Sequence, residues 1–174
     1  MIYVDLENLV IRDMAAGDAE IFAAGERAQG WSGATAEKNI KRMEDRDAGK
    51  CITVVAEYNG EPAGYVSLYH HTQAGPFAKD GLPEIVDFNV LEKFRRKGIG
   101  SRLMDLMEML ARRESSVVTI GVGLHVSYGP AQVMYVKRGY VPSGDGVWSY
   151  GKIPEPYTSV ENDDDLVLYL SKKL

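Results

Sequence analysis

Residues 93–102 read KFRRKGIGSR, which places four basic side chains beside two glycines and adds a fifth basic residue after them. The stretch lies where an apolar run ending at Val90 gives way to a helical pattern. The first N–H groups of a helix have no partner within it, and the helix dipole adds positive charge there, so a phosphate binds readily. Gly98 and Gly100 would let the backbone approach that phosphate and adopt dihedrals that a side chain would forbid. The stretch therefore predicts a phosphate-binding unit of strand, loop and helix.

The helix after this loop is predicted from its apolar spacing. Ile99, Leu103, Leu106 and Leu110 recur at intervals of four, three and four residues, so they share one face of a helix from Gly98 to about Arg113.

The rest of the chain alternates between strand and helix patterns. Strands are predicted at 8–14, 51–58, 63–71, 84–90, 117–124 and 165–172, and further helices at 18–31, 35–50 and 131–138. Asn59-Gly60 is a strong hairpin signal between two of the strands, and Thr35 is placed to cap a helix. The pattern predicts an α/β fold with a mixed sheet of about six or seven strands and about four helices. A length of 174 residues fits one domain, residues 1–174.

Composition narrows the classes of partner. The formal net charge of -5 disfavours nucleic acid, because phosphate neutralisation needs a broadly basic face. Cys51 is the single cysteine, so no internal disulfide forms. No apolar run approaches the ~18 residues of a membrane span, and the charged opening lacks the apolar core of a signal peptide. These features predict a soluble cytoplasmic protein with no membrane partner.

Two familiar phosphate loops fail on spacing. A dinucleotide fingerprint needs a third glycine where Leu103 stands, and a second candidate fails at Val126. The P-loop pattern G-x-x-x-x-G-K-[ST] does not occur in the chain. The pattern that remains is R-x-x-G-x-G, from Arg95 to Gly100, after a strand and before an amphipathic helix.

Two segments resemble the motifs of the GNAT superfamily of acyl-CoA-dependent N-acyltransferases. Residues 89–107, NVLEKFRRKGIGSRLMDLM, are similar to its acetyl-CoA motif, and residues 131–140, AQVMYVKRGY, are similar to its A-x-x-L-Y-x-x-x-G-F motif. The resemblance implies a GNAT-like domain that uses acetyl-CoA as its cosubstrate. By position, it implies that backbone groups of Phe88, Asn89 and Val90 pair with the pantetheine arm. It also implies that N–H groups of the loop hold the pyrophosphate, namely those of Arg95, Arg96, Lys97, Gly98, Ile99, Gly100 and Ser101.

The chain departs from the family pattern at two positions. Tyr128 stands three residues before Ala131, where many members have asparagine, and Gly123 stands where several members have an acidic base near the end of the fifth strand. The resemblance therefore supplies no base at position 123.

The reaction implied by the resemblance needs a proton acceptor for the amine and benefits from a proton donor for the departing thiolate. The second motif implies Tyr135 as the donor; a packed aromatic on a short helix is the alternative reading. The strand 84–90 resembles one in which a glutamate six residues before the terminal valine takes the proton, which implies Glu84. A solvent-facing Glu84 is the alternative, and Asp87 competes from the opposite face of the strand.

The predicted function is transfer of an acetyl group from acetyl-CoA directly to a primary amine of a small molecule or peptide terminus. Cys51 lies far from both motifs, so a covalent acyl-enzyme has no evident nucleophile. The three histidines lack the spacing of a metal site, so no metal is predicted. A non-catalytic acyl-CoA-binding sensor is the alternative, since it would need neither Tyr135 nor a base. A nucleotide-binding interaction module is disfavoured by the failed fingerprints, and a homodimer is left open.

Overall fold

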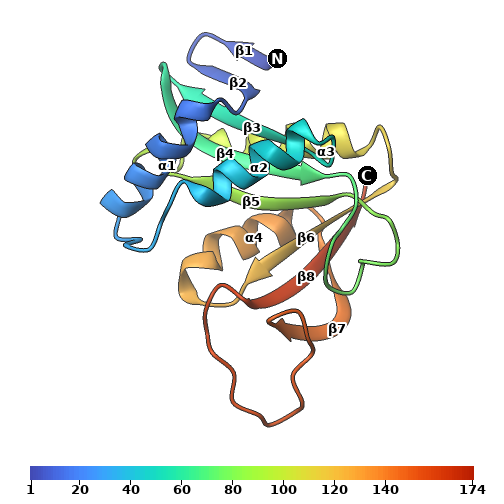
Figure 1. The fold of residues 1–174 in the computed structure, drawn as a ribbon. Coiled ribbons are helices and arrows are strands. Elements are labelled where there is room, and N and C mark those ends of the chain that lie inside the picture. Colours follow the sequence, from blue (N-terminus) through green and yellow to red (C-terminus); the bar gives the residue numbers. More distant parts are fainter. The chain divides into compact units, whose positions relative to one another are not determined.

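The computed structural model describes residues 1–174 as eight strands, four α-helices and two short 3-10 helices (Figure 1). The strands are β1 (Ile2–Leu6), β2 (Leu9–Asp13), β3 (Cys51–Tyr58), β4 (Glu61–Tyr69), β5 (Glu84–Val90), β6 (Val117–Gly123), β7 (Val141–Ser149) and β8 (Leu166–Lys173). The helices are α1 (Ala16–Ala28), α2 (Glu37–Asp47), η1 (Glu92–Phe94), α3 (Ile99–Ala111), η2 (Val126–Tyr128) and α4 (Gly129–Lys137).

The strands form one mixed sheet in the order β1-β2-β3-β4-β5-β6-β8-β7. The pairing of β5 with β6 is parallel, and β6 with β8 and β7 with β8 are antiparallel. The predicted α/β class and the four helices are confirmed, but the sheet has eight strands because β1 and β7 were missed. Strand β7 could not be predicted because it contains Pro142, Gly144 and Gly146, and these residue types usually mark turns. Its pairing with β8 shifts register between Pro142 and Val147.

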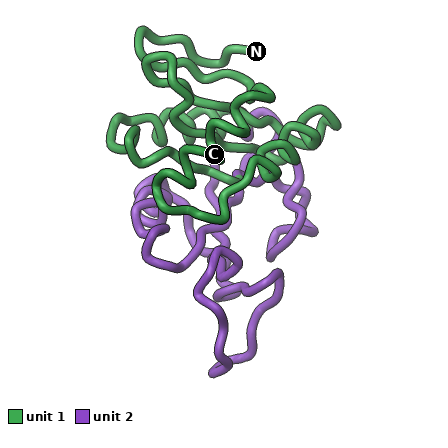
Figure 2. Tube along the Cα trace, turned by 60° about the vertical axis from the view of Figure 1, so that its left-hand side comes forward, with its two compact units in different colours: residues 1–69, 86–110 green, residues 70–85, 111–174 purple.

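The chain divides into two compact units, shown in green and purple in Figure 2. Unit 1 comprises Met1–Tyr69 and Val86–Leu110, and unit 2 comprises His70–Ile85 and Ala111–Leu174. Strand β5 begins in unit 2 and continues in unit 1.

In unit 1, the β3–β4 hairpin forms where the sequence predicts it. Asn59 and Gly60 have φ of 52° and 80°, and Tyr58 pairs with Glu61 across the turn. Two successive positive φ values are typical of the turn that matches the twist of a two-residue hairpin. The Asn59-Gly60 prediction is therefore confirmed.

Helices α1 and α2 pack side by side over β3 and β4 (Figure 1). The start of α1 is fixed by Asp18, which accepts the Ala15 N–H at 2.7 Å and two hydrogen bonds from the Arg12 guanidinium on β2. Arg12 also donates to Glu57 on β3 at 2.6 Å, so one cation ties two strands to a helix. A carboxylate at the start of a helix also stabilises it by interacting with the positive end of the helix dipole.

The prediction that Thr35 caps α2 is wrong. The cap residue is Ala36, and no side chain bonds to the first turn. Glu37 supplies a negative charge in that turn instead, which suits the helix dipole without a capping hydrogen bond.

Helix α3 follows the predicted periodicity. Ile99, Leu103, Leu106 and Leu110 are all buried, which confirms the apolar face read from their spacing. The helix covers the face of the sheet opposite α1, because the Phe88 ring on β5 lies against α3 whereas the next side chain, Asn89, reaches α1.

In unit 2, β6 lies between β5 and β8. Glu84 and Ile85 of β5 pair in parallel with Thr119 and Ile120 of β6. Helix α4 follows β6 and ends at a left-handed glycine, Gly139, with φ of 89°. A glycine just past a helix end is the usual way to satisfy its last carbonyl groups. No helix of the chain is both long and apolar enough to cross a membrane.

Candidate functional site

The basic loop of residues 93–102 is braced from within. The Arg95 side chain donates from Nε to the Val90 carbonyl at 3.0 Å and from Nη1 to Glu92 at 3.2 Å. The Leu91 N–H donates to the Ala63 carbonyl on β4 at 2.9 Å, so the loop departs from a fixed point of the sheet. Arg95 therefore holds the arch that follows β5, in addition to contributing positive charge.

The backbone between this arch and α3 is twice left-handed. Arg96 has φ of 63° and Gly98 has φ of 80°. The Arg102 N–H donates to the Gly98 carbonyl at 3.1 Å, which is the first hydrogen bond of α3. The N–H groups of residues 99–101 precede that bond and have no acceptor in the helix. A left-handed turn followed by a helix start is an anion-binding geometry.

The two glycines of the loop serve different purposes. Gly98 needs its positive φ, as predicted, and no atom lies within 4 Å of where a side chain would begin. Gly100 has no positive φ, so the prediction of a special dihedral there is wrong. A Cβ at Gly100 would lie 3.1 Å from Cζ of Phe88, so its missing side chain lets α3 rest against β5.

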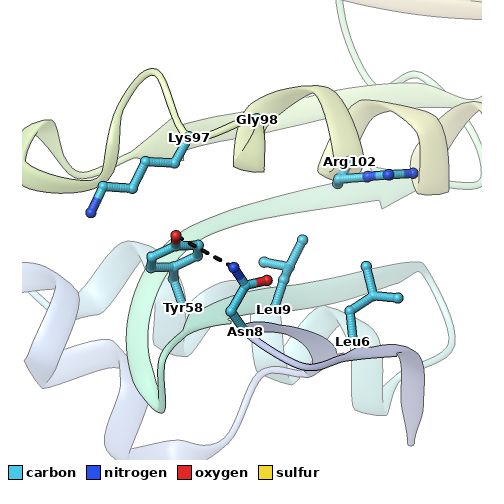
Figure 3. A pocket seen from close by; sticks show the side chains of 7 residues that line it. All are labelled: Leu6, Asn8, Leu9, Tyr58, Lys97, Gly98 and Arg102. Atoms are coloured by element: carbon cyan, nitrogen blue, oxygen red, sulfur yellow. Dashed lines mark hydrogen bonds between the residues drawn. The ribbon is translucent and has the colours of Figure 1, made fainter.

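A shallow pocket of about 280 Å³ lies beside the loop (Figure 3). Lys97 and Arg102 form one wall in Figure 3, and Tyr58, Asn8 and Leu9 form the other. Gly98 and Leu6 complete the lining. The Lys97 ammonium lies 4.8 Å from the centre of the Tyr58 ring and 5.5 Å from that of Phe94. The pocket thus adds two cations and an aromatic surface next to the anion-binding backbone.

The strand before the loop contains a distortion at Asp87, whose φ is 52°. Its carboxylate forms an ion pair with Nε of Arg42 on α2. Arg42 also donates to the Tyr69 hydroxyl at 2.6 Å, and Tyr69 donates to Asp45 at 2.6 Å. Hydrogen bonds from Lys41 and then from Tyr69 hold the pKa of Asp45 well below its usual range. Asp87 is therefore engaged by a cation, which weakens its claim as a competing base.

A second set of side chains fixes the same strand two residues later. Asn89 donates to Glu26 on α1 at 2.8 Å, and the buried Tyr65 hydroxyl donates to the same oxygen at 2.6 Å. Burial, and then the negative charge of Glu26, raise the pKa of Tyr65 far above the ordinary tyrosine value. Lys38 donates to the Tyr65 hydroxyl at 2.8 Å, so a cation completes the chain.

The backbone of β5 refines the prediction for Phe88, Asn89 and Val90. The Asn89 carbonyl oxygen lies 2.7 Å from where a Cβ at Gly64 would stand, so it points toward β4. Successive residues of a strand direct their N–H and C=O groups to opposite edges. The groups of Phe88 and Val90 therefore point to the other edge, and the Val90 carbonyl already accepts a bond from Arg95.

Tyr135 lies on α4 in unit 2 and is 4% exposed. Its ring centre is 5.9 Å from that of Tyr140. Burial, and then the proximity of Tyr128, raise the pKa of Tyr135 above the ordinary tyrosine value. The side chain therefore stays protonated through the alkaline range and is a hydrogen-bond donor.

Glu84 opens β5 in unit 2 and is 9% exposed. Its backbone pairs with Thr119 of β6. Burial, and then the negative charge of Glu84, raise the pKa of Tyr169. Glu84 is therefore a buried carboxylate, unlike the solvent-facing alternative. Of the predicted site residues, 88–90 and 95–101 lie in unit 1, whereas Tyr135 and Glu84 lie in unit 2.

Cys51 is 3% exposed, and burial raises the pKa of its thiol. A thiol held in its neutral form is a poor nucleophile, because the thiolate is the reactive species. This geometry gives Cys51 a packing role in β3.

Unit 2 also contains a cluster that sequence reasoning missed. Both ring nitrogens of His125 are hydrogen-bonded. Nδ1 lies 2.7 Å from Oγ of Ser127, and Nε2 lies 2.9 Å from Oδ1 of Asp164. The Tyr128 hydroxyl donates to the same Asp164 oxygen at 2.8 Å, and its ring centre is 4.5 Å from that of His125. Asp164 is 39 residues from His125, so no local spacing could indicate the pair. The chain nevertheless has no group of three or more histidine, cysteine, aspartate and glutamate side chains suited to a metal ion.

Tyr128 explains the glycine that ends β6. A Cβ at Gly123 would lie only 2.3 Å from Cε2 of Tyr128, so the tyrosine ring occupies the space of the missing side chain. Gln132 of α4 donates to the Gly123 carbonyl at 2.9 Å and fixes the same corner. The two departures from the family pattern, Gly123 and Tyr128, therefore depend on each other, because the Tyr128 ring fits only where position 123 has no side chain.

Known structures share the fold at low sequence identity. Ard1 from Thermoplasma volcanium has a TM-score of 0.69 at 20% identity, with 96% of this chain and 98% of that chain covered. An acetyl transferase from Salmonella typhimurium that modifies the N-terminal serine of a 50S ribosomal subunit protein has a TM-score of 0.71 at 14% identity, with coverage of 100% and 99%. A Salmonella typhimurium protein described as an acetyltransferase, solved with its cofactor acetyl-CoA, has a TM-score of 0.65 at 16% identity, with coverage of 96% and 94%.

The family is shown by sequence. No curated protein matches this sequence at a significant level. The sequence model of the acetyltransferase (GNAT) family, however, matches residues 20–140, which is more than half of the chain and includes the glycine loop, Glu84 and Tyr135. The protein therefore belongs to the acetyltransferase (GNAT) family.

Proposed function

We propose that residues 1–174 form one N-acetyltransferase domain that transfers the acetyl group of acetyl-CoA directly to a primary amine. The observation that carries this proposal is the junction of β5 and α3, where left-handed backbone at Gly98 leads into helix N–H groups without helical acceptors. That junction suits a pyrophosphate, and acetyl-CoA supplies the acetyl group as a reactive thioester. The expected location is the cytoplasm.

The cosubstrate is held by two neighbouring parts of unit 1 in this proposal. Backbone groups of Phe88 and Val90 that point away from β4 receive the pantetheine arm, and Asn89 fixes the strand through Glu26. The N–H groups of the loop from Arg96 to Ser101 surround the pyrophosphate. The Arg95 N–H, which the sequence also assigned to it, instead donates to the Glu92 carbonyl at 3.1 Å. Arg96 and Lys97 add charge to it.

The acid–base roles fall to unit 2. Tyr135 donates a hydrogen bond to the sulfur as the carbon–sulfur bond breaks. Its raised pKa makes complete proton transfer to a thiolate uphill, since cysteine-like thiols have a pKa of ~8.5. Its contribution is therefore stabilisation of the developing negative charge, with the proton shared in the transition state. Glu84 takes the proton of the ammonium before attack.

Direct transfer is favoured because the only thiol is buried. Cys51 is 3% exposed, and burial raises the pKa of its thiol. An acetyl-cysteine intermediate would need a thiolate that reaches the cosubstrate, and Cys51 has neither property.

The acceptor is tested with a panel of amines, by measuring thiol release from acetyl-CoA. The panel includes polyamines, aminoglycosides and peptides that begin with serine or alanine. The peptides are included because two similar structures are ribosomal-protein acetyltransferases, one of them a ribosomal-protein-alanine N-acetyltransferase from Brucella melitensis with a TM-score of 0.66. Amine-dependent thiol release supports the enzyme, and tight acetyl-CoA binding without release on any amine supports the sensor.

We expect Gly98→Ala to weaken acetyl-CoA binding by roughly 10-fold, because a side chain in left-handed backbone costs ~1–2 kcal/mol. In the Gly98→Ala variant the unliganded loop relaxes to a less strained conformation, and it must return to the left-handed one to bind. Calorimetric titration measures the change. Gly49→Ala is the matched control. Gly49 also has a positive φ, 71°, and open space for a side chain, but it lies after α2 and outside the glycine loop. The variant should bind acetyl-pantetheine, which lacks the pyrophosphate, as the wild type does; an equal loss with that ligand would contradict the role of the loop.

Tyr135→Phe keeps the ring and removes the hydroxyl, so turnover should drop by roughly 10- to 1000-fold with little change in acetyl-CoA affinity. Because the pKa of Tyr135 is raised, this tyrosine should cause no loss of wild-type activity below about pH 10. Initial rates against pH measure both effects. Wild-type turnover in the variant would mean that the sulfur is stabilised by another donor.

Glu84→Gln preserves size but cannot accept a proton, so the rate at neutral pH should fall by roughly 100-fold. The loss should shrink as the pH approaches the pKa of the substrate, ~10.4 for a lysine-like amine, because the amine is then increasingly neutral. Rates of wild type and variant from pH 7 to pH 10, on the best amine of the panel, measure the difference. A defect of constant size over that range would assign Glu84 to amine binding instead.

A further inference from the structure

The cluster of His125, Ser127, Tyr128 and Asp164 in unit 2 has a defined hydrogen-bond direction. An ionised carboxylate can only accept, so Nε2–H of His125 donates to Asp164 across 2.9 Å. In the neutral ring the other nitrogen, Nδ1, then carries the lone pair and accepts the hydroxyl proton of Ser127 across 2.7 Å. This is the arrangement in which a carboxylate fixes the tautomer of a histidine base and stabilises its protonated form.

The cluster lies at the start of the helix that contains Tyr135, because η2 (Val126–Tyr128) leads directly into α4 (Gly129–Lys137). Tyr128 is the cap residue of α4 and has helical dihedrals. Tyr135 follows it by seven residues, which places the two side chains on one side of the helix, two turns or about 10 Å apart along the axis. Side chains of a helix lean toward its N-terminus, so the Tyr135 hydroxyl is directed back toward the cluster. The influence of Tyr128 on the pKa of Tyr135 is consistent with this proximity.

The arrangement is open to a substrate. The side chains of His125 and Asp164 are 26% and 80% exposed, and Ser127 is exposed. A hydrogen bond between side chains this exposed contributes little to stability, so its residues can be substituted in a folded protein.

We propose that His125, held by Asp164, accepts a proton from the acceptor nitrogen during acetyl transfer, through the hydroxyl of Ser127. The proposal rests on the proposed N-acetyl transfer. It is compatible with Glu84, because an ammonium loses two protons in becoming an amide: Glu84 takes the first before attack, and His125 takes the second as the nitrogen attacks.

The proton and electron movements balance. The lone pair of the neutral amine forms a bond to the thioester carbonyl carbon, and a nitrogen proton passes to Oγ of Ser127 while the serine proton moves to Nδ1 of His125. Asp164 stabilises the imidazolium that results. The carbon–sulfur bond breaks with its electron pair on sulfur, the Tyr135 hydroxyl stabilises the thiolate by donating a hydrogen bond, and the released CoA thiolate takes its proton from water. His125 finally returns its proton to water.

The tautomer of His125 is measured on the protein alone by nitrogen NMR of the imidazole rings. We expect a proton on Nε2 and none on Nδ1 at neutral pH in the wild type, and loss of this preference in Asp164→Asn. A proton on Nδ1 in the neutral ring of the wild type would overturn the proposal, because Nδ1 could not then accept one.

Kinetics on the best amine of the panel test the role itself. His125→Gln should lower kcat by roughly 100-fold, whereas the KM of the amine changes less than about twofold. Asp164→Asn should lower kcat less, because the base remains. His70→Gln is the matched control, since His70 is also a partly exposed histidine bonded to a carboxylate, that of Glu114, at 2.8 Å, and the kcat of the variant should equal that of the wild type.

Imidazole added to His125→Ala should restore part of the lost kcat, which a purely structural histidine would not allow. An unchanged kcat in His125→Gln, or a loss confined to KM, would overturn the proposal while leaving the acetyltransferase activity intact. Absence of amine-dependent thiol release by the wild-type protein would instead remove the proposed function, and this role with it.

Discussion

The backbone of β5 between Asp87 and Asn89 is the constraint on which the strand, loop and helix of the proposed cosubstrate site depend. Asp87 is left-handed, a conformation that costs ~1–2 kcal/mol for a residue with a side chain, although aspartate tolerates it better than most. Its ion pair with Arg42 offsets that cost, and the bond from Asn89 to Glu26 fixes the strand two residues later. Helices α2 and α1 thereby hold the two side chains that flank Phe88.

The arch and α3 take their direction from this fixed strand. Arg95 ties the arch back to the Val90 carbonyl, and Gly100 lets α3 lie against the Phe88 ring. The loop between them needs only one special dihedral at a glycine, that of Gly98, to aim the first N–H groups of α3 at an anion. A rigid strand followed by a preorganised loop suits a cosubstrate with a long flexible arm, because little of the protein has to be ordered on binding.

Sequence reasoning predicted this half of the candidate site because its signals are local. The spacing of Arg95, Gly98 and Gly100, the helical periodicity after Gly98 and the hairpin at Asn59-Gly60 all lie within short stretches of chain. It erred where one residue type has two uses: Gly100 serves packing rather than a dihedral, and the glycines of β7 lie within a strand. The partners of long-range polar pairs could not be found, because nothing near Asp87 or His125 in the sequence indicates Arg42 or Asp164.

The central claim is that β5 and the loop after it bind the acyl-CoA. Titration of nitrogen-labelled protein with CoA, followed by amide NMR, tests it most directly. The account predicts that the largest shifts fall on the amides of residues 96–101 and on Phe88 and Val90, and that acetyl-pantetheine reproduces only the strand shifts. Shifts absent from residues 96–101 and concentrated instead on Leu6, Asn8 and Tyr58 would place the cosubstrate against the far wall of the neighbouring pocket and contradict the claim.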